Sequence, residues 1–97
     1  MTDLIDRAVA YVQSPHYRDL TTRQLALLGV AMRHDSPLPV RDMARELRLA
    51  KPVVTRALHA LERCGFVERR GGVDKRDRFI HVTAAGRAFR AKLGDVA

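Results

Sequence analysis

A pair of short helical patterns, separated by only a few residues, constrains this chain more than any other feature of its sequence. Apolar residues recur with helical spacing over residues 40–47 and again over residues 54–61, and Leu49 interrupts the series between them. Gly65 follows the second series, where a glycine adopts the left-handed backbone conformation that ends many helices. Two helices joined by so short a connection, the second of them basic, are typical of a helix-turn-helix.

Two β-prone runs follow, at residues 66–70 and 78–82. The segment between them contains Gly71 and Gly72, which favour a hairpin turn, and several basic residues. A basic hairpin behind a helix-turn-helix is a wing. The sequence therefore predicts one domain over residues 1–97, mainly α-helical with a small β-hairpin (an α+β fold), with the architecture of a winged helix-turn-helix.

The flanking segments complete the expected fold. Thr21, followed three residues later by a glutamine, forms a capping box at the start of a helix over residues 22–33. That helix is apolar around much of its circumference, which suits the centre of a core. Leu38 is expected to form a very short edge strand against the hairpin, because prolines flank it. Thr83 is expected to cap a last helix over residues 84–93.

The second helix of the pair presents a basic face. At 100° per residue its apolar side chains point one way, and Pro52, Arg56, His59 and Arg63 point almost directly opposite. Lys51 flanks that outer face near its N-terminal end. In a recognition helix the N-terminal residues meet base edges, so Lys51, Thr55 and Arg56 are candidates for groove contacts. Pro52 and Val53 offer apolar surface to a thymine methyl group. The predicted DNA-binding residues of this helix are Lys51, Pro52, Val53, Thr55, Arg56 and His59.

The distribution of charge favours the same partner. The chain has a formal net charge of +7, and residues 41–78 hold eleven basic and six acidic side chains, whereas residues 1–40 are balanced. An excess placed on the helix-turn-helix and the wing points to a polyanionic partner. RNA and anionic membranes are disfavoured, because no aromatic-rich sheet or basic amphipathic anchor is present. Candidate phosphate contacts are Arg41, Arg63 and Arg70.

The wing is expected to touch DNA through its own basic residues. Arg76 suits a narrow, A·T-rich minor groove, because a guanidinium loses its hydration more easily than an ammonium. Lys75 and Arg78 are expected to meet the flanking phosphates and to contribute mainly to the salt dependence of binding. The alternative is a tip that contributes only diffuse positive charge.

Several segments together resemble the MarR-type regulators. They are residues 20–28, residues 40–47, residues 53–67, the run DKRDR at residues 74–78 and the run VTAAGR at residues 82–87. The wing motif is the most specific of these. The resemblance implies a winged-helix transcriptional regulator that binds double-stranded DNA.

Two departures from that pattern have consequences. Ala50 stands where the family often has a small hydroxyl residue, so the side-chain cap of the recognition helix and its phosphate contact are missing. The chain ends at Ala97, which leaves no room for the long C-terminal helices that build the dimer and the ligand pocket in fuller members. A small-molecule ligand is therefore not expected, and regulation would come through abundance, competition or a protein partner.

The terminal helices are expected to form a homodimer. Residues 3–13 contain an apolar stripe at helical spacing that must pack against its own domain or a second subunit, and we favour the second subunit. Such a dimer would set two recognition helices about 34 Å apart, one DNA turn, on an inverted repeat. The predicted interface residues are Leu4, Ile5, Ala8, Val9, Val12, Phe89 and Leu93.

Signals for other classes of protein are missing. The four histidines are scattered and there is one cysteine, so no metal site, disulfide or cofactor is expected, and no nucleophile or phosphate-loop motif suggests an enzyme. Cys64 is expected to pack as a small hydrophobe, with a redox switch as the alternative. The chain lacks a signal peptide and an apolar run of the roughly 20 residues that span a bilayer, so a cytoplasmic protein is expected.

These patterns lead to one expectation and two alternatives. We expect a sequence-specific regulator of transcription that acts as a homodimer on a promoter, as a repressor. The first alternative is a winged-helix adaptor that binds proteins, since a fold does not determine its function. The second is an architectural DNA-binding protein without sequence preference. The basic face around Arg56 argues against the adaptor, which would tend to carry apolar or acidic residues there.

Overall fold

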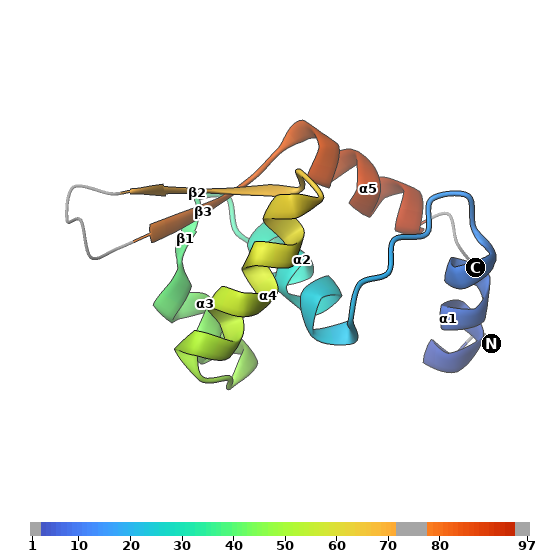
Figure 1. Ribbon diagram of the computed structural model, residues 1–97, viewed down its shortest axis with the longest axis horizontal. Helices are drawn as coiled ribbons and strands as arrows, with labels where there is room; N and C mark the ends of the chain where they lie inside the picture. Colours follow the sequence, from blue (N-terminus) through green and yellow to red (C-terminus); the bar gives the residue numbers. More distant parts are fainter. Residues whose placement is uncertain (1–2, 72–77, 95–97) are drawn as a thin grey trace.

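A helix-turn-helix and a three-stranded sheet form the body of the protein, in a computed structural model that describes residues 3–71 and 78–94 (Figure 1). The sheet is antiparallel with strand order β1-β3-β2, and its hairpin lies across one side of helices α2, α3 and α4. This is the predicted winged helix-turn-helix. The elements are α1 (Leu4–Gln13), α2 (Thr22–Arg33), β1 (Leu38–Pro39), α3 (Val40–Leu47), α4 (Lys51–Arg63), β2 (Val67–Gly71), β3 (Arg78–Val82) and α5 (Ala84–Gly94).

Helix α2 occupies the centre of the core, as its sequence predicted. Its start is the expected capping box: the Gln24 backbone N–H donates to Thr21 Oγ1 at 3.1 Å, and the Thr21 N–H donates to Gln24 Oε1 at 2.8 Å. Four of its residues are buried. The largest fully buried side chains of the domain are Leu27, Leu28, Met43, Val54, Leu58, Leu61 and Ile80, from α2, α3, α4 and β3.

Helix α4 ends in a Schellman motif at the predicted glycine. Gly65 has a φ of 76°, and its N–H donates to the carbonyl of Glu62 at 2.9 Å. The N–H of Phe66 donates to the carbonyl of Leu61 at 3.0 Å, and both side chains lie in the core. This is the two-bond pattern that satisfies the last carbonyls of a helix. It turns the chain directly into β2.

The short strand β1 pairs with β3, as expected for Leu38. Leu38 lies opposite Ile80 and Pro39 opposite Phe79, which makes the strand two residues long. β1 is at the edge of the sheet, where a proline does not interrupt a ladder. Pro39 is also the N-cap residue of α3, so no residue separates the strand from the helix.

Helix α5 is attached to the end of α4 through Thr83. The Thr83 hydroxyl donates to the carbonyl of Gly65 at 2.5 Å and accepts from the N–H of Gly86 at 3.0 Å, which confirms Thr83 as a cap. The rings of Phe66 and Phe89 stack with their centroids 4.4 Å apart. Phe89 is only 6% exposed and packs in the core of its own chain, which leaves little of its surface for the predicted dimer interface.

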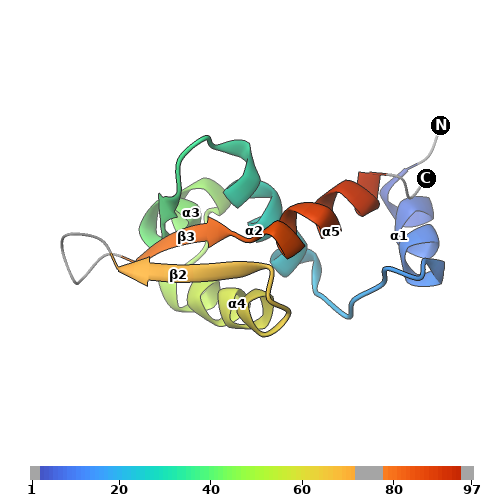
Figure 2. The same cartoon turned by 90° about the horizontal axis from the view of Figure 1, so that it is seen from above.

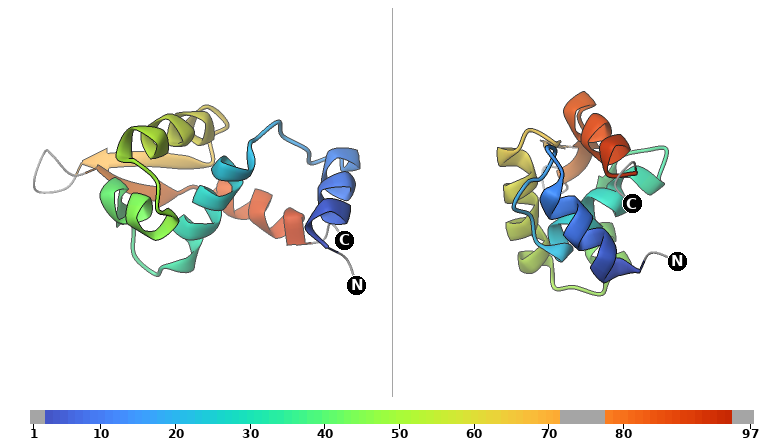
Figure 3. Two further views of the ribbon diagram at one scale, coloured as in Figure 1. Left: turned by 90° about the horizontal axis from the view of Figure 1, so that it is seen from below. Right: turned by 90° about the vertical axis from the view of Figure 1, so that its right-hand side faces the viewer.

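Helix α1 stands apart from this body. It lies beside the far end of α5, opposite the hairpin end of the sheet, and an extended segment connects it to α2 (Figures 2 and 3). None of its residues is buried, and its ring contact with the core is the edge of Tyr11 against Phe89, with centroids 6.3 Å apart. Its large apolar side chains are exposed: Leu4 by 74%, Ile5 by 71%, Val9 by 52% and Val12 by 60%.

Candidate nucleic-acid interface

The outer face of α4 gathers the predicted contact residues. Lys51, Pro52, Arg56 and His59 are exposed, and Val53 and Thr55 are half-buried at the margins of the same face. The opposite face of the helix is in the core, where Val54, Leu58 and Leu61 have no exposed surface. Burial of these side chains stabilises the fold by about 1.5–3 kcal/mol for each large one. It therefore fixes the rotation of α4 and keeps the opposite face toward solvent.

Every acidic side chain of α3, α4 and β2 lies in an ion pair. Asp42 Oδ1 is 3.7 Å from Arg45 Nη1 and 3.9 Å from Arg41 Nε. Glu46 accepts a hydrogen bond from His34 Nε2 at 2.5 Å and lies 4.0 Å from Arg33. Glu62 pairs with Arg69 and Glu68 with Arg70, each at 2.7 Å.

The cations of α4 are left without partners by this arrangement. Among the described residues, Lys51, Arg56 and Arg63 make no ion pair, because the nearby carboxylates are taken by residues of other elements. The first turn of α4 also has no acidic residue, and Ala50 provides no side-chain cap. A helix N-terminus also carries a partial positive charge of its own. The positive charge at this end of α4 is therefore not neutralised by an acidic side chain of its first turn.

The other predicted phosphate contacts differ from Arg63. Arg41 is beside Asp42, and Arg70 donates from both Nε and Nη2 to the same oxygen of Glu68, at 3.0 and 2.7 Å. Both pairs are solvent-exposed and therefore weak. Part of the charge of each arginine is therefore already compensated within the fold.

The Glu62–Arg69 pair connects α4 to the wing, and sequence reasoning missed it. The two side chains are 28–29% exposed, and the paired atoms, Glu62 Oε1 and Arg69 Nε, are closed off from solvent without an aligned hydrogen bond. A signal was available. Arg69 follows Val67 by two positions, so it lies on the inner face of β2, where a charged residue needs a partner.

We expect Glu62→Gln to lower the free energy of unfolding by about 1–3 kcal/mol. The reason is that the Arg69 guanidinium would stay charged and partly buried without a counter-ion. Glu68→Gln is the matched control, since its pair with Arg70 is exposed; its effect should be about 0.5 kcal/mol or less. Urea unfolding followed by circular dichroism measures both. Equal effects would mean that the α4–β2 pair has no structural role.

The predicted wing contacts are described only in part. Lys75 and Arg76 lie outside the described residues. Arg78 begins β3 opposite Gly71 and is exposed; a Cβ atom built on that glycine would lie 2.9 Å from Arg78 Nη1. The guanidinium therefore lies over the glycine, where a larger side chain would displace it.

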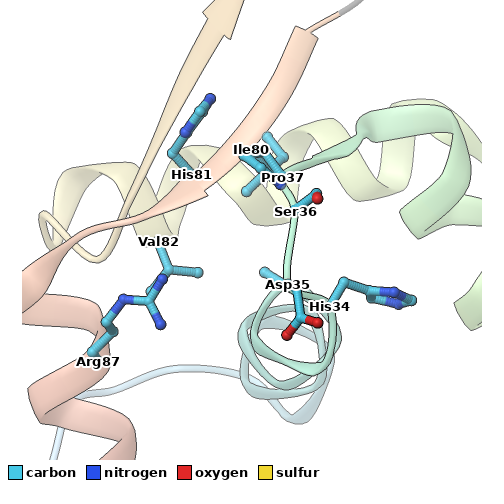
Figure 4. Close-up of a pocket in the computed structure, with 9 residues that line it drawn as sticks. His34, Asp35, Ser36, Pro37, Ile80, His81, Val82 and Arg87 are labelled. Carbon is cyan, nitrogen blue, oxygen red and sulfur yellow. The ribbon is translucent and has the colours of Figure 1, made fainter.

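A small recess lies away from this face, between the end of α2 and the start of α5 (Figure 4). Its volume is about 70 Å³, far below the roughly 300 Å³ at which pockets for organic ligands begin. The polar residues that line it include His34, Asp35, His81 and Arg87. It has room for a few water molecules.

Other kinds of site find little support in the described part of the chain. No three histidine, cysteine, aspartate or glutamate side chains come together there in a way that would hold a metal ion. Cys64 is half-buried and packs against the core beside Gly65. None of the helices over residues 3–71 and 78–94 is long and apolar enough to cross a bilayer.

Comparison with known proteins identifies the family to which this chain belongs. A model of the MarR family matches residues 18–77, which begin shortly before α2 and end immediately before β3. The comparison with curated proteins found no match.

Several solved structures superpose well on this chain. A mutant of MepR from a multidrug-resistant S. aureus clinical isolate is 28% identical, with a TM-score of 0.76 over 80% of this chain. The S. aureus MepR–DNA complex (24% identity) gives 0.82 over 96%, and a MarR-family transcriptional regulator from Rhodococcus sp. RHA1 (24%) gives 0.77 over 92%. This chain spans 57%, 74% and 60% of their respective lengths.

Proposed function

Since this chain belongs to the MarR family, we propose that it is a transcriptional regulator that binds double-stranded DNA in a sequence-specific way. The observation that supports this most directly is the uncompensated basic face of α4, where Lys51 and Arg56 lie exposed on a helix whose back is buried. A structurally similar protein, MepR, has been solved in complex with DNA. Docked in a major groove, the first turns of α4 would meet base edges, and the wing would meet the neighbouring backbone.

Its action as a homodimer is the second part of the proposal. The exposed apolar side chains of α1 form a face that the rest of the domain leaves uncovered. A second copy of α1 would cover this face with apolar side chains of the same kind. A two-fold dimer would bind an inverted repeat, with half-sites about one DNA turn apart. Occupying a promoter in this way would repress transcription, which a reporter placed behind the preferred site would measure.

Arg56→Ala tests the specific part of the proposal. We expect it to weaken binding to the preferred site by about 1–3 kcal/mol if Arg56 pairs with a guanine, and to weaken binding to random DNA much less. The preferred site is first selected from a random pool, and affinities on both DNAs are then measured by fluorescence anisotropy.

Arg90→Ala is the matched control for Arg56→Ala. It removes one exposed cation from α5, away from the α4 face, and should leave the preference for the selected site unchanged. Equal losses on selected and random DNA from Arg56→Ala would assign Arg56 to phosphate and favour an architectural protein. No binding of duplex DNA by the unaltered chain would contradict the proposal altogether.

A further inference from the structure

The turn between α3 and α4 contains an unusual backbone conformation. Arg48 has φ 55° and ψ 44°, and it is the one non-glycine residue with positive φ among residues 3–71 and 78–94. Its N–H donates to the carbonyl of Arg45 at 3.2 Å, and the N–H of Leu49 donates to that of Ala44 at 3.0 Å. This is a Schellman motif with an arginine in the position where helices usually have glycine.

The same chain provides the comparison. After α4 an identical pair of hydrogen bonds places Gly65 in the left-handed position. A side chain with a Cβ atom is strained in this conformation, and a glycine is not. Arg48 therefore costs stability that a glycine at the same site would not cost.

Nothing within the described fold offsets this cost. The Arg48 side chain is exposed and makes no hydrogen bond or ion pair with residues 3–71 or 78–94. The carboxylates of α3 are occupied, Asp42 by Arg41 and Arg45, and Glu46 by Arg33 and His34. A strained residue without an internal role is a candidate for a functional one.

The position of Arg48 suggests which function. It lies three residues before Lys51, in the turn that leads into the first turn of α4. Figure 1 shows this turn between α3 and α4. Arg48, Lys51 and Arg56 are thus three cations without internal partners around the end of the helix that would enter the groove. When a helix-turn-helix docks, its first helix, here α3, crosses the DNA backbone. Arg48 directly follows that helix.

We propose that Arg48 is a DNA-backbone anchor: its guanidinium binds a phosphate at the edge of the groove and positions the N-terminal end of α4. The inference rests on the proposed function, because it assumes that α4 docks on DNA. A guanidinium offers two parallel N–H donors to phosphate oxygens, which fixes orientation as well as charge. The strain at φ 55° is then retained because the contact needs a side chain.

The test is Arg48→Gly, which should change stability and affinity in opposite directions. Its melting temperature should rise by about 4 °C, because the strain is relieved. Its affinity should fall about five- to tenfold on both the selected site and random duplex DNA, and the slope of log K against log salt should decrease by about one. Arg48→Lys keeps both the charge and the strain, so it should retain most of the affinity and the original melting temperature.

Each other result would overturn the inference. If Arg48→Gly binds both DNAs as tightly as the unaltered chain, Arg48 touches no phosphate, while the proposed function stands. Loss confined to the selected site would make it a base contact instead. A lower melting temperature in Arg48→Gly would mean that the arginine supports the fold. If the unaltered chain binds no duplex at all, the proposed function has failed, and this inference fails with it.

Discussion

Gly86→Ala is expected to destabilise the domain by about 2–3 kcal/mol, or roughly 10–20 °C in melting temperature, although alanine is normally the better residue in a helix. A Cβ atom on Gly86 would lie 2.2 Å from the carbonyl oxygen of Phe66 and 3.0 Å from the carbonyl carbon. That carbonyl accepts the N–H of Thr83 at 3.0 Å, so it cannot move without breaking the junction between α4 and α5.

Gly29→Ala is the control for that prediction. Gly29 lies inside α2, and a Cβ atom there would meet nothing within 4 Å. The substitution should therefore stabilise by about 0.5–1 kcal/mol, the ordinary gain from removing a helical glycine. Urea unfolding of the two variants gives the comparison. Stabilisation by both would show that α5 can shift away from Phe66 at no cost, contrary to the packing described above.

The double variant Leu4→Asp plus Val9→Asp is expected to separate the proposed dimer into monomers. Both side chains are exposed in the single chain, so the substitutions should leave its fold intact while burying carboxylates in any α1–α1 contact. Binding to an inverted repeat should then weaken by about 10²–10⁴-fold, because the second half-site is no longer engaged by the same molecule. Binding to a single half-site should stay unchanged.

Molecular mass in solution and DNA binding together measure this effect. The control is Arg7→Asp plus Gln13→Asp, which adds two carboxylates to the same helix away from the apolar stripe; it should remain dimeric. A monomeric mass for the unaltered chain at micromolar concentration, with no change in the double variant, would remove the dimer from the proposed function and leave the DNA-binding face of α4 untouched.

Local patterns were sufficient to predict most of the fold. The 3.6-residue spacing located the five helices found in residues 3–71 and 78–94. Gly65 and Thr83 marked where α4 ends and α5 begins, because caps are decided by a few neighbouring residues. The pairing of Leu38 with the wing was expected, and its flanking prolines limited that strand to an edge of the sheet. These features depend on short-range rules, and a single sequence contains them.

Features that depend on long-range packing were harder to predict. Periodicity placed Phe89 on the apolar side of its helix, but the ring that it stacks against, Phe66, is 23 residues away in the sequence and is known only from the fold. The partners of Glu62 and Glu46 lie on other elements, so the lack of compensation around Lys51 was not visible in the sequence. The run that contains Gly86 was recognised as typical of a family, while the reason for its glycine, a backbone carbonyl 2.2 Å from a would-be Cβ, comes from the fold.

The two-residue strand β1 has a mechanical consequence. Pro39 is paired with Phe79 of the hairpin and is also the N-cap residue of α3. No linker residue therefore separates the sheet from the helix-turn-helix at this point. The Glu62–Arg69 pair braces the hairpin against α4 on the other side. Because the hairpin is held both at Pro39 and at Arg69, the angle between the hairpin and α4 stays fixed unless one of these two contacts is broken. In the proposed dimer, the span between the two α4 helices would therefore change by movement of each whole domain about α1, and not by movement of α4 against its own hairpin.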